Sequence, residues 1–496
     1  MTSDPTSIVA IGHLPHATGG IDFPLVSNAR PTTPVLTRIL ADASGTTSQD
    51  LRRRVLESAT WRTDYATLLA ELTSASARET PTAYTIATEG LASARRNMIW
   101  AHGTAESPLD DLDVSSGQAW DPGMETVTGT GRPVMQLQVP YRGRQLAGSA
   151  LLDQLDVWVA EGTGEPSFRD AIARVVAHPE WLPAPGRRIV LIGAGAELSP
   201  LAPLTTWGAD VLAIDVAGSD LWRRIGDLAG AGAGTVQWPL RPDGTPGLDV
   251  TSHLRELTAW LNQAADDAPL VLGMYAYADR GAHVRVTMAV DLMATHLCTV
   301  NPETSLSYLA TPTDAFVVPR EVVHAGHAAW RDRGALKHLQ WLARCASRGA
   351  LFQPSYTTLH ENGTGIADIL VPQQGPSYAL AKRLQRWRGI IAEHDGHPVS
   401  FNVAPASWTR SVTRNRVLAA AYRGARHFRV EVFEPDTCRV LMAALLVHDL
   451  HHRPGTRPHP EALFSDQALH GGLWRSAYEP KSALGFAALL GALTPH

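Results

Sequence analysis

The sequence predicts an α/β protein with a doubly wound parallel sheet, preceded by a mainly helical N-terminal region and followed by a C-terminal extension. From residue 187 onward, short apolar segments typical of buried strands alternate with segments of helical length. This alternation is the pattern of βαβ units. The first apolar segment also ends in glycines, as expected where a strand turns tightly into a helix.

Composition limits the class of protein further. The chain has 496 residues, a length that predicts two to four domains. Of these residues 44% are hydrophobic and 18% are charged, which is enough apolar side chains for a sizeable core. The net charge of −5 leaves no basic excess for neutralising phosphates along a nucleic acid. A nucleic-acid partner is therefore not expected.

The cysteines and the termini indicate a cytoplasmic protein. Cys298, Cys345 and Cys438 are far apart and form no CxxC pair, which predicts neither a metal site nor a disulfide framework. The N-terminus lacks the basic and apolar segments of a secretory signal. The apolar stretch "VLMAALLV" has 8 residues, too few to span a bilayer.

The elements before the sheet are read from spacing and composition. Residues 1–30 look irregular, whereas apolar residues from about Thr33 to Asn97 recur at helical spacing. A loop rich in Gly, Asp, Ser and Thr follows over 103–132, then a short strand and a helix. The proline-containing junction at 181–188 is the best domain boundary, which divides the chain into 1–185, 186–440 and 441–496.

The second region carries the sheet. Its expected strands are 187–196, 209–216, 234–240, 268–277, 304–312 and 397–405. Expected helices are 249–265, 283–297, 326–347 and 377–395, and the third of these falls in a helical insertion near 320–370. We expect the apolar side of that third helix, with Leu339, Trp341 and Leu342, to cover the mouth of a site or to pack between domains.

The glycine turn suggests a nucleotide site. Gly193 and Gly195 stand where the first strand turns, and Asp215 ends the next strand 20 residues after Gly195. Such a turn lets a phosphate approach the backbone, and such an acid can accept hydrogen bonds from a ribose diol. The third glycine of the fingerprint is absent, because Leu198 holds its place. Asp215 favours NAD over NADP, although Arg223 and Arg224 keep NADP open, and S-adenosylmethionine suits the same turn.

A tyrosine and a lysine share one face of the helix expected at 377–395. Tyr378 and Lys382 are four residues apart in "YALAK". An ammonium beside a phenol is expected to lower the phenol pKa from about 10, so that the tyrosine can exchange a proton with a carbonyl or an alcohol.

The order of these motifs resembles the short-chain dehydrogenase/reductase family over residues 187–420, most strongly in "YALAK" and "VSFNVAPASWT". The resemblance implies a Rossmann-like, NAD(P)-binding fold with Tyr378 as proton donor and Lys382 as its partner. It also implies that Asp249 and Val250 line the adenine pocket, that Gly273 lies in the turn beside the cofactor, and that Pro405 and Thr409 adjoin the nicotinamide.

Three positions depart from the family pattern. No serine precedes Tyr378 at the usual distance, so Thr311 or Thr313 is the expected orienting hydroxyl, more than 60 residues upstream. Asp291 stands where the family commonly has asparagine, from which it could support a water relay to Lys382. Ala406 replaces the glycine that usually follows the turn proline.

These observations favour an NAD(P)-dependent oxidoreductase that interconverts a carbonyl and an alcohol on a small-molecule substrate, bulky and apolar judging from Tyr275, Tyr277 and Tyr308. A methyltransferase that uses S-adenosylmethionine stays an alternative, but it leaves Tyr378 and Lys382 unexplained. A catalytically inactive dinucleotide-binding scaffold is the other, favoured by the missing glycine and Asp291. A homo-oligomer also stays open. The histidines near 448–459 are read as a solvated helix end rather than a zinc site.

Overall fold

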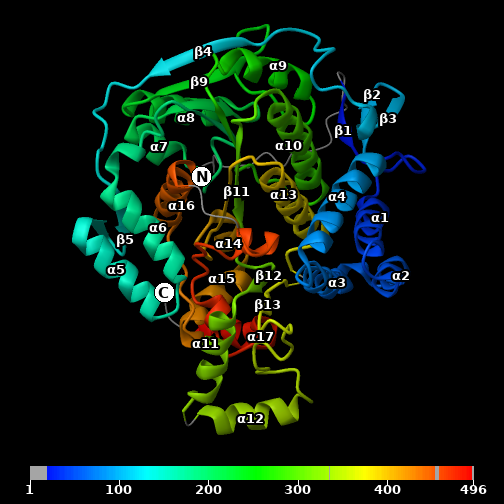
Figure 1. Ribbon diagram of the computed structural model, residues 1–496, viewed down its shortest axis with the longest axis vertical. Coiled ribbons are helices and arrows are strands. Elements are labelled where there is room, and N and C mark those ends of the chain that lie inside the picture. The colour runs from blue at the N-terminus through cyan, green and yellow to red at the C-terminus, as the bar shows by residue number, and fades with distance from the viewer. Residues whose placement is uncertain (1–18, 335, 372, 453–456, 494–496) are drawn as a thin grey trace, which may run out of the picture.

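The central feature of the protein is a seven-stranded sheet, six of whose strands are parallel (Figure 1). The computed structural model describes residues 19–334, 336–371, 373–452 and 457–493. The parallel strands are β7 (Arg188–Ile192), β8 (Asp210–Ile214), β9 (Thr235–Leu240), β10 (Leu270–Met274), β11 (Ser305–Ala310) and β14 (Val399–Val403). Their spatial order is β14-β11-β10-β7-β8-β9, so the predicted doubly wound parallel sheet is confirmed.

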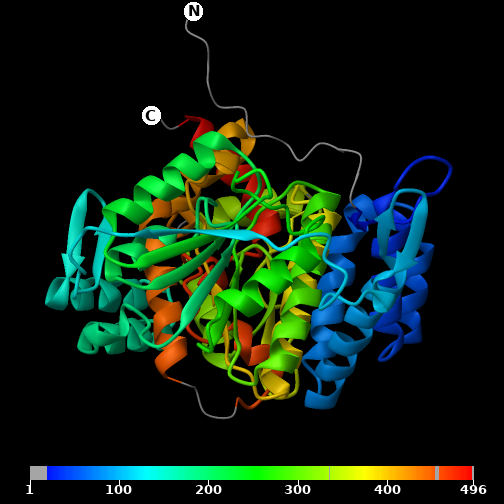
Figure 2. The same cartoon turned by 90° about the horizontal axis from the view of Figure 1, so that it is seen from above.

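Alternating residues of each strand bury against helices on both faces of the sheet. In β7, Ile189 and Leu191 pack into one helical layer, whereas Val190 and Ile192 pack into the other. Each fully buried residue of this size stabilises the fold by roughly 1.5–3 kcal/mol. The continuous apolar strands of the sequence therefore reflect a sheet covered on both sides, as Figure 2 shows from above.

The two helical layers come from different parts of the chain. One contains α9 (Leu254–Ala264), α10 (Gly281–Val300) and α13 (Pro376–His394). The other contains α5 (Gly148–Ala160), α6 (Pro166–Ala177), α7 (Leu201–Trp207), α8 (Ser219–Ala231) and α16 (Pro435–His451). Crossover connections of this kind put helices on both faces, which is the doubly wound arrangement.

The N-terminal helices pack outside the first layer. They are α1 (Thr32–Gly45), α2 (Gln49–Glu57), α3 (Trp61–Ser76) and α4 (Thr80–Asn97). Ser48 caps α2 by accepting a hydrogen bond from Leu51 N at 3.1 Å. A small antiparallel sheet joins β1 (Gly20–Asp22), β2 (Ile99–His102) and β3 (Ala105–Pro108), so part of the segment expected to be irregular is a strand. Residues 1–18 of that segment lie outside the described residues.

Residues on both sides of the boundary expected at 185 contribute to the central sheet. The strand β4 (Gly123–Thr128) pairs antiparallel with β9 at the sheet edge, in a region that the sequence predicted to be loop. Its side chains are mostly exposed, so neither burial nor periodicity marks it as a strand. The short strand expected after it is a hairpin of β5 (Gln138–Tyr141) and β6 (Arg144–Ala147).

An arm projects from the body between β11 and α13 (Figure 1). Its base, formed by β12 (Ala315–Val318) and β13 (Gly365–Asp368), packs in the core of the body, and α11 (Arg320–Arg331) leads outward to α12 (Leu336–Ala346) at the tip. The expectation that the apolar side of this region packs inward is wrong for α12. Leu339, Trp341 and Leu342 are exposed to solvent, because the inner side of the helix is built from polar and small residues.

The C-terminal part returns over the sheet and the arm. After β14 come α14 (Arg410–Arg414), α15 (Arg416–Ala425) and α16, and the chain ends in α17 (Pro480–Leu493). The helices α15 and α17 cross at Gly424 and Gly491, where a Cβ at Gly424 would lie 1.9 Å from the Ala487 carbonyl oxygen. Short 3-10 turns at Leu109–Asp111, Pro179–Trp181, Arg426–Phe428, Pro460–Phe464 and Leu473–Arg475 complete the structure.

Candidate active site

The carboxyl end of β11 and the first turn of α13 form the centre of the candidate site. Gly375, with φ +85°, and Pro376 at the first helical position start α13 just before Tyr378. The Tyr65 hydroxyl of α3 accepts from Gly375 N at 3.2 Å and donates to the Val371 carbonyl at 2.9 Å. The N-terminal helices therefore hold the start of the helix that carries the predicted pair.

Thr311 lies close to Tyr378 in space, although the whole arm separates the two residues in sequence. Thr311 follows the last residue of β11, and its hydroxyl lies close enough to the Tyr378 phenol to act on its pKa. Thr311 Oγ1 lies 2.8 Å from Thr313 Oγ1, which accepts from Gln374 Nε2 at 2.8 Å. The Gln374 amide nitrogen can only donate, so the Thr313 hydroxyl is free to donate in turn to Thr311.

Lys382 lies one turn after Tyr378, with its Nζ 5.9 Å from the centre of the Tyr378 ring. The ammonium donates to the Leu309 carbonyl at 3.0 Å and to Gln385 Oε1 at 3.2 Å. Burial lowers the pKa of Lys382 to about 8, and attraction by Asp314 opposes this shift only in part.

The predicted lowering of the Tyr378 pKa is wrong for this arrangement. Burial raises the pKa of Tyr378 above its ordinary value, and the nearby Thr311 hydroxyl opposes this shift without reversing it. The reason is geometric, because the Lys382 ammonium donates its hydrogen bonds to Leu309 and Gln385 and not to the phenol oxygen. Tyr378 is therefore a neutral phenol at neutral pH and can act as an acid.

Aromatic rings surround this phenol. His283 of α10 is fully buried and stacks on the Tyr378 ring, with centroids 5.3 Å apart and planes at 16°. Its Nδ1 accepts from Ala278 N, and burial lowers its pKa to about 3, so the ring is neutral. Tyr277 lies 5.9 Å from Tyr378 and is 60% exposed. No sequence signal marks His283, because a lone histidine in an apolar helix belongs to no motif.

The other tyrosines after strands lie elsewhere. Tyr308 is buried and packs on Phe401 at 5.2 Å, so it is a core residue and not the expected pocket wall. Tyr275 donates or accepts a hydrogen bond with Ser307 at 2.8 Å. Ser307 and Tyr308 are neighbours on β11, so their side chains point to opposite faces of the sheet. Tyr275 therefore lies with Ser307 on one face, and Tyr308 lies in the core on the other.

Asp291 does not serve the expected relay. Its carboxylate accepts from Arg388 Nε at 2.6 Å and from Arg95 Nη2 at 2.7 Å. It thereby ties α10 to α13 and to the N-terminal helix α4. Gln385, which no sequence motif marks, contacts Lys382 in its place.

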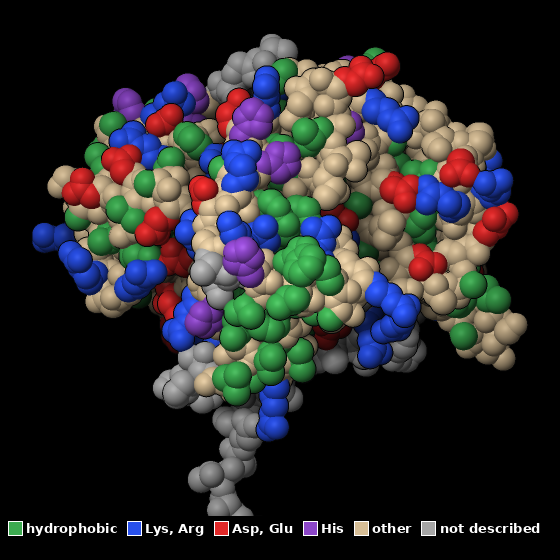
Figure 3. All heavy atoms as spheres, turned by 90° about the horizontal axis from the view of Figure 1, so that it is seen from below, with side chains coloured by type: hydrophobic (Ala, Val, Ile, Leu, Met, Phe, Trp, Pro, Cys, Tyr) green, Lys and Arg blue, Asp and Glu red, His purple; other side chains and the backbone are tan. Residues whose placement is uncertain are grey.

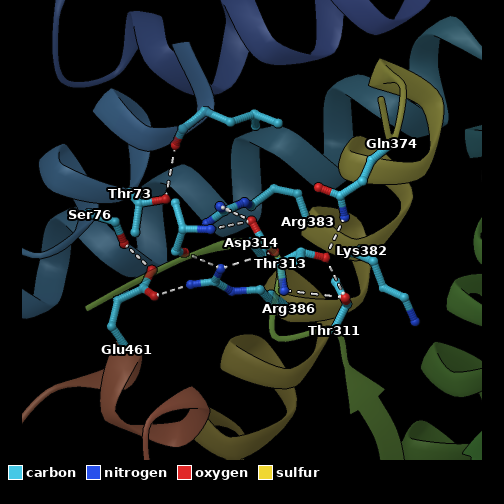
Figure 4. A network of polar contacts seen from close by, with 12 residues as sticks. Thr73, Ser76, Thr311, Thr313, Asp314, Gln374, Lys382, Arg383, Arg386 and Glu461 are labelled. Atoms are coloured by element: carbon cyan, nitrogen blue, oxygen red, sulfur yellow. Dashed lines mark hydrogen bonds and ion pairs between the residues drawn. The ribbon is translucent and has the colours of Figure 1, made fainter. Parts of the chain in front are cut away.

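A buried ion cluster supports α13 behind the site (Figure 4). Asp314 lies 3.3 Å from both Arg383 Nη2 and Arg386 Nη1, and Arg386 Nη2 lies 2.6 Å from Glu461. Ser76 of α3 donates to Glu461 at 2.7 Å. All four charged residues are nearly inaccessible to solvent, with two charges of each sign. The cluster joins the N-terminal helices, the arm, α13 and the C-terminal segment.

The glycine turn lies at the switch point of the sheet, where β7 separates β8 from β10. Gly193 has φ +85°, and a Cβ there would lie 2.4 Å from Ala276 N, so only glycine fits. Gly195 N donates to Asp215 Oδ2 at 2.8 Å. The glycine turn and Asp215 therefore lie next to each other.

Asp249 is brought to the same place. It lies close enough to Asp215 to raise its pKa, although burial is the larger cause and Arg224 acts in the opposite direction. Asp249 Oδ1 also accepts from Thr251 N and Oγ1 at 2.8 Å, which caps the turn before α9. Val250 is buried in the core.

The remaining predicted cofactor residues lie in β10 and in the segment that follows β14. Gly273 lies inside β10 rather than in a turn, and a Cβ there would lie 2.5 Å from the Tyr275 ring, so it makes room for that ring. Pro405 is buried after β14, and Thr409 precedes α14. Arg410 N donates to Glu197 Oε2 at 3.0 Å, so this segment runs from the end of β14 towards the glycine turn.

The ribose of a dinucleotide fits this turn better than its diphosphate does. Asp215 is a half-buried carboxylate at a strand end, where a ribose diol could donate to it. The N–H groups of Gly193 and Ala194 donate to Ile214 O, and that of Ala196 donates to Gly193 O. The helix α7 begins only at Leu201 and has 7 residues. The turn is therefore not a phosphate cradle at a helix N-terminus.

The buried lysine gives a pH-dependent stability prediction. Because the Lys382 pKa falls from 10.5 to about 8, the unfolded chain binds more protons between these values, and the stability of the protein should rise with pH in this window. Lys382→Met should stabilise the fold at pH 7 by up to roughly 3 kcal/mol, since one pKa unit is about 1.4 kcal/mol. Urea unfolding at pH 7 and pH 10.5 measures this gain, which should vanish at the higher pH. An equal gain at both pH values would contradict the charge argument.

No metal centre is formed by the described part of the chain, in which no group of three or more His, Cys, Asp or Glu side chains could hold an ion. His448 Nδ1 lies 3.0 Å from Asp449, and His451 Nδ1 lies 2.9 Å from the Val447 carbonyl.

A cavity of about 460 Å³ lies between α1, α2 and α4, away from the site.

Comparison with known proteins gives partial likenesses among solved structures. No family model and no curated protein matches the chain. The terminal reductase domain of a myxalamid biosynthetic pathway is 15% identical, over 51% of this chain and 60% of that chain, with a TM-score of 0.31. A short-chain dehydrogenase/reductase family oxidoreductase from Burkholderia thailandensis is 14% identical (58% and 92%, TM-score 0.32). One from Mycobacterium ulcerans is 12% identical (50% and 79%, TM-score 0.30).

Proposed function

We propose that the protein is an NAD(P)-dependent oxidoreductase that interconverts a carbonyl and an alcohol on a small molecule. The observation that carries the proposal is the meeting of Thr311, Tyr378 and Lys382 at the carboxyl ends of the central strands. These residues come from two elements separated by more than 60 residues, so their proximity does not follow from helical spacing alone.

The protein side chains account for the proton transfer. Tyr378 is protonated at neutral pH and can donate its phenol hydrogen to a carbonyl oxygen. Below about pH 8 the Lys382 ammonium is charged and stabilises the phenolate that forms. A bound nicotinamide dinucleotide would supply or accept the hydride, and Asp215 is the residue that would hold its adenosine ribose. Carbonyl reduction should therefore slow as the pH rises above 8.

The surroundings of Tyr378 favour an uncharged, apolar substrate. His283 is neutral, and Tyr277 stands beside Tyr378 with most of its side chain exposed. Trp408 and Tyr422 add a ring pair 5.8 Å apart, and Tyr422 lies close enough to Tyr378 to raise its pKa. Apolar walls with few polar groups are typical of sites for such molecules.

One observation favours a second function. The backbone donors of the glycine turn are bonded within the protein, which is unfavourable for a diphosphate. This feature favours the catalytically inactive scaffold, which would still bind the adenosine part of a nucleotide through Asp215 but would convert no substrate. A methyltransferase using S-adenosylmethionine would also use Asp215, but it gives Tyr378 no role.

Calorimetric titration with NADH, NADPH and S-adenosylmethionine tests these functions. We expect NADH or NADPH to bind and Asp215→Ala to weaken that binding by about 10- to 100-fold, because hydrogen bonds to a charged group are lost. Asp210→Ala is the matched control, since Asp210 is exposed at the opposite end of β8.

The outcomes separate the functions. Binding of NAD(P)H followed by its oxidation with a panel of apolar aldehydes and ketones supports the oxidoreductase. Binding without turnover over the whole panel supports the scaffold. Binding of S-adenosylmethionine alone, or no dependence on Asp215, contradicts the proposal.

A further inference from the structure

The helix α12 at the tip of the arm presents apolar side chains to solvent. Leu339, Trp341 and Leu342 are 65%, 63% and 56% exposed, and Cys345, one turn after Trp341, is exposed as well. The side chains that face the body, Gln340, Ala343, Arg344 and Ser347, are half-buried. A surface helix normally has the opposite orientation, with its apolar side inward.

The orientation of α12 is set by specific contacts on its inner side. Arg333 stacks on Trp330 of α11 with its guanidinium carbon 3.2 Å from the ring centre, and its Nη1 donates to Gln340 at 3.4 Å. Trp330 in turn packs on Tyr478, 5.9 Å away, in a small apolar cluster with Phe352. The outward position of Trp341 therefore results from a structured arm.

This part of the arm is positively charged. Residues 333–360 contain Arg333, Lys337, Arg344 and Arg348 and no Asp or Glu, although the whole chain has a net charge of −5. Lys337 and Arg348 are exposed. Figure 3, seen from the end where the arm projects, shows hydrophobic side chains gathered together with Lys, Arg and His side chains around them.

We propose that α12 docks the protein on the surface of a bilayer that contains anionic phospholipids. A basic helix with Trp and Leu on one face lies in the interfacial plane, where the apolar side chains enter the acyl boundary and the cations meet the headgroups. The arm projects from the body, so that α12 can reach a flat surface (Figure 1). The contact is peripheral, since no helix in the described ranges is long and apolar enough to cross a bilayer.

Charge favours this occupant over a second copy of the chain. Pairing two α12 helices would bring together two segments with four cations each and no acids between Asp332 and Glu361. An anionic bilayer neutralises the same charges and at the same time buries Trp341 and Leu342.

Co-sedimentation of the full chain with vesicles tests the proposal. We expect binding to vesicles of phosphatidylcholine with 30% phosphatidylserine, weaker binding at high salt, and little binding to phosphatidylcholine alone. Trp341→Ala should weaken binding about tenfold, which corresponds to the lost burial of one large apolar side chain. Lys337→Gln with Arg348→Gln should weaken it about 25-fold, at about fivefold for each cation near the surface.

Two controls keep the result independent of folding. Leu56→Ser removes a similarly exposed apolar side chain on α2 and should bind vesicles as well as the parent does. A polarity-sensitive fluorophore on Cys345 reports insertion in the unsubstituted chain, since Cys298 is half-buried and Cys438 is buried. Its emission should shift to the blue only with anionic vesicles.

Three results would overturn the proposal. These are equal binding to neutral and anionic vesicles, unchanged binding of Trp341→Ala, and no spectral shift at Cys345. Dimers that form without lipid and are lost in Trp341→Ala would assign the face to a second copy instead. None of these results bears on whether Tyr378 is catalytic.

Discussion

Tyr378→Phe should lower the rate of carbonyl reduction by about 10²- to 10⁴-fold, the usual contribution of a positioned acid. The ring and its stacking on His283 are kept, so the loss would come from the phenol proton alone. Binding of NAD(P)H should change little, because the expected ribose residues lie at the glycine turn. Stopped-flow reduction and calorimetric titration on the same preparation measure both quantities.

Tyr84→Phe is the matched control for this variant. Tyr84 is a half-buried tyrosine on α4 that packs against His394, 4.2 Å away, at the opposite end of α13 from Tyr378. It should keep full activity. A fully active Tyr378→Phe enzyme would remove the mechanism, whereas loss of activity together with loss of cofactor binding would point to a folding defect.

Asp314→Asn should destabilise the protein by about 3–5 kcal/mol, the usual cost of removing one partner of a buried ion pair. The substitution removes the carboxylate that pairs with Arg383 and leaves Arg386 with Glu461 alone. Equilibrium unfolding in guanidinium chloride gives the free energy of unfolding. Asp50→Asn, on an exposed pair with Arg53 and Arg54, should cost no more than about 1 kcal/mol.

A double variant separates charge from packing in this cluster. Asp314→Asn with Arg383→Met removes one charge of each sign, so it should be less destabilising than Asp314→Asn alone. If the free energy of unfolding of the double variant instead falls by the sum of the two single losses, the cluster is held by packing and not by charge balance. Because Lys382 lies on the same helix, the single variant should also weaken catalysis by displacing that helix.

Local pattern was enough to predict the sheet and the helix that carries Tyr378 and Lys382. The apolar strands around Val190 and Leu272 are buried on both faces, so their composition alone marks them as parallel strands. The glycine turn and Asp215 were predictable for the same reason, since spacing along one strand–turn–strand unit is a local property.

The partners of these residues were decided by packing between segments distant in sequence. Asp291 sits on α10 at a position that suggested a relay, yet two arginines from α4 and α13 take its carboxylate. Tyr65 of α3 and His283 of α10 reach the site from elements far from Tyr378 in sequence, and no motif spacing connects them to it.

The amino-acid order thus specified the parallel sheet, the glycine turn and the phenol–ammonium pair, because each depends on residues near one another along the chain. Folding in three dimensions decided the charge states and the partners: a raised Tyr378 pKa, a lowered Lys382 pKa and an outward Trp341. Desolvation and long-range packing act between surfaces that only the folded chain brings together, so periodicity and spacing carry no record of them.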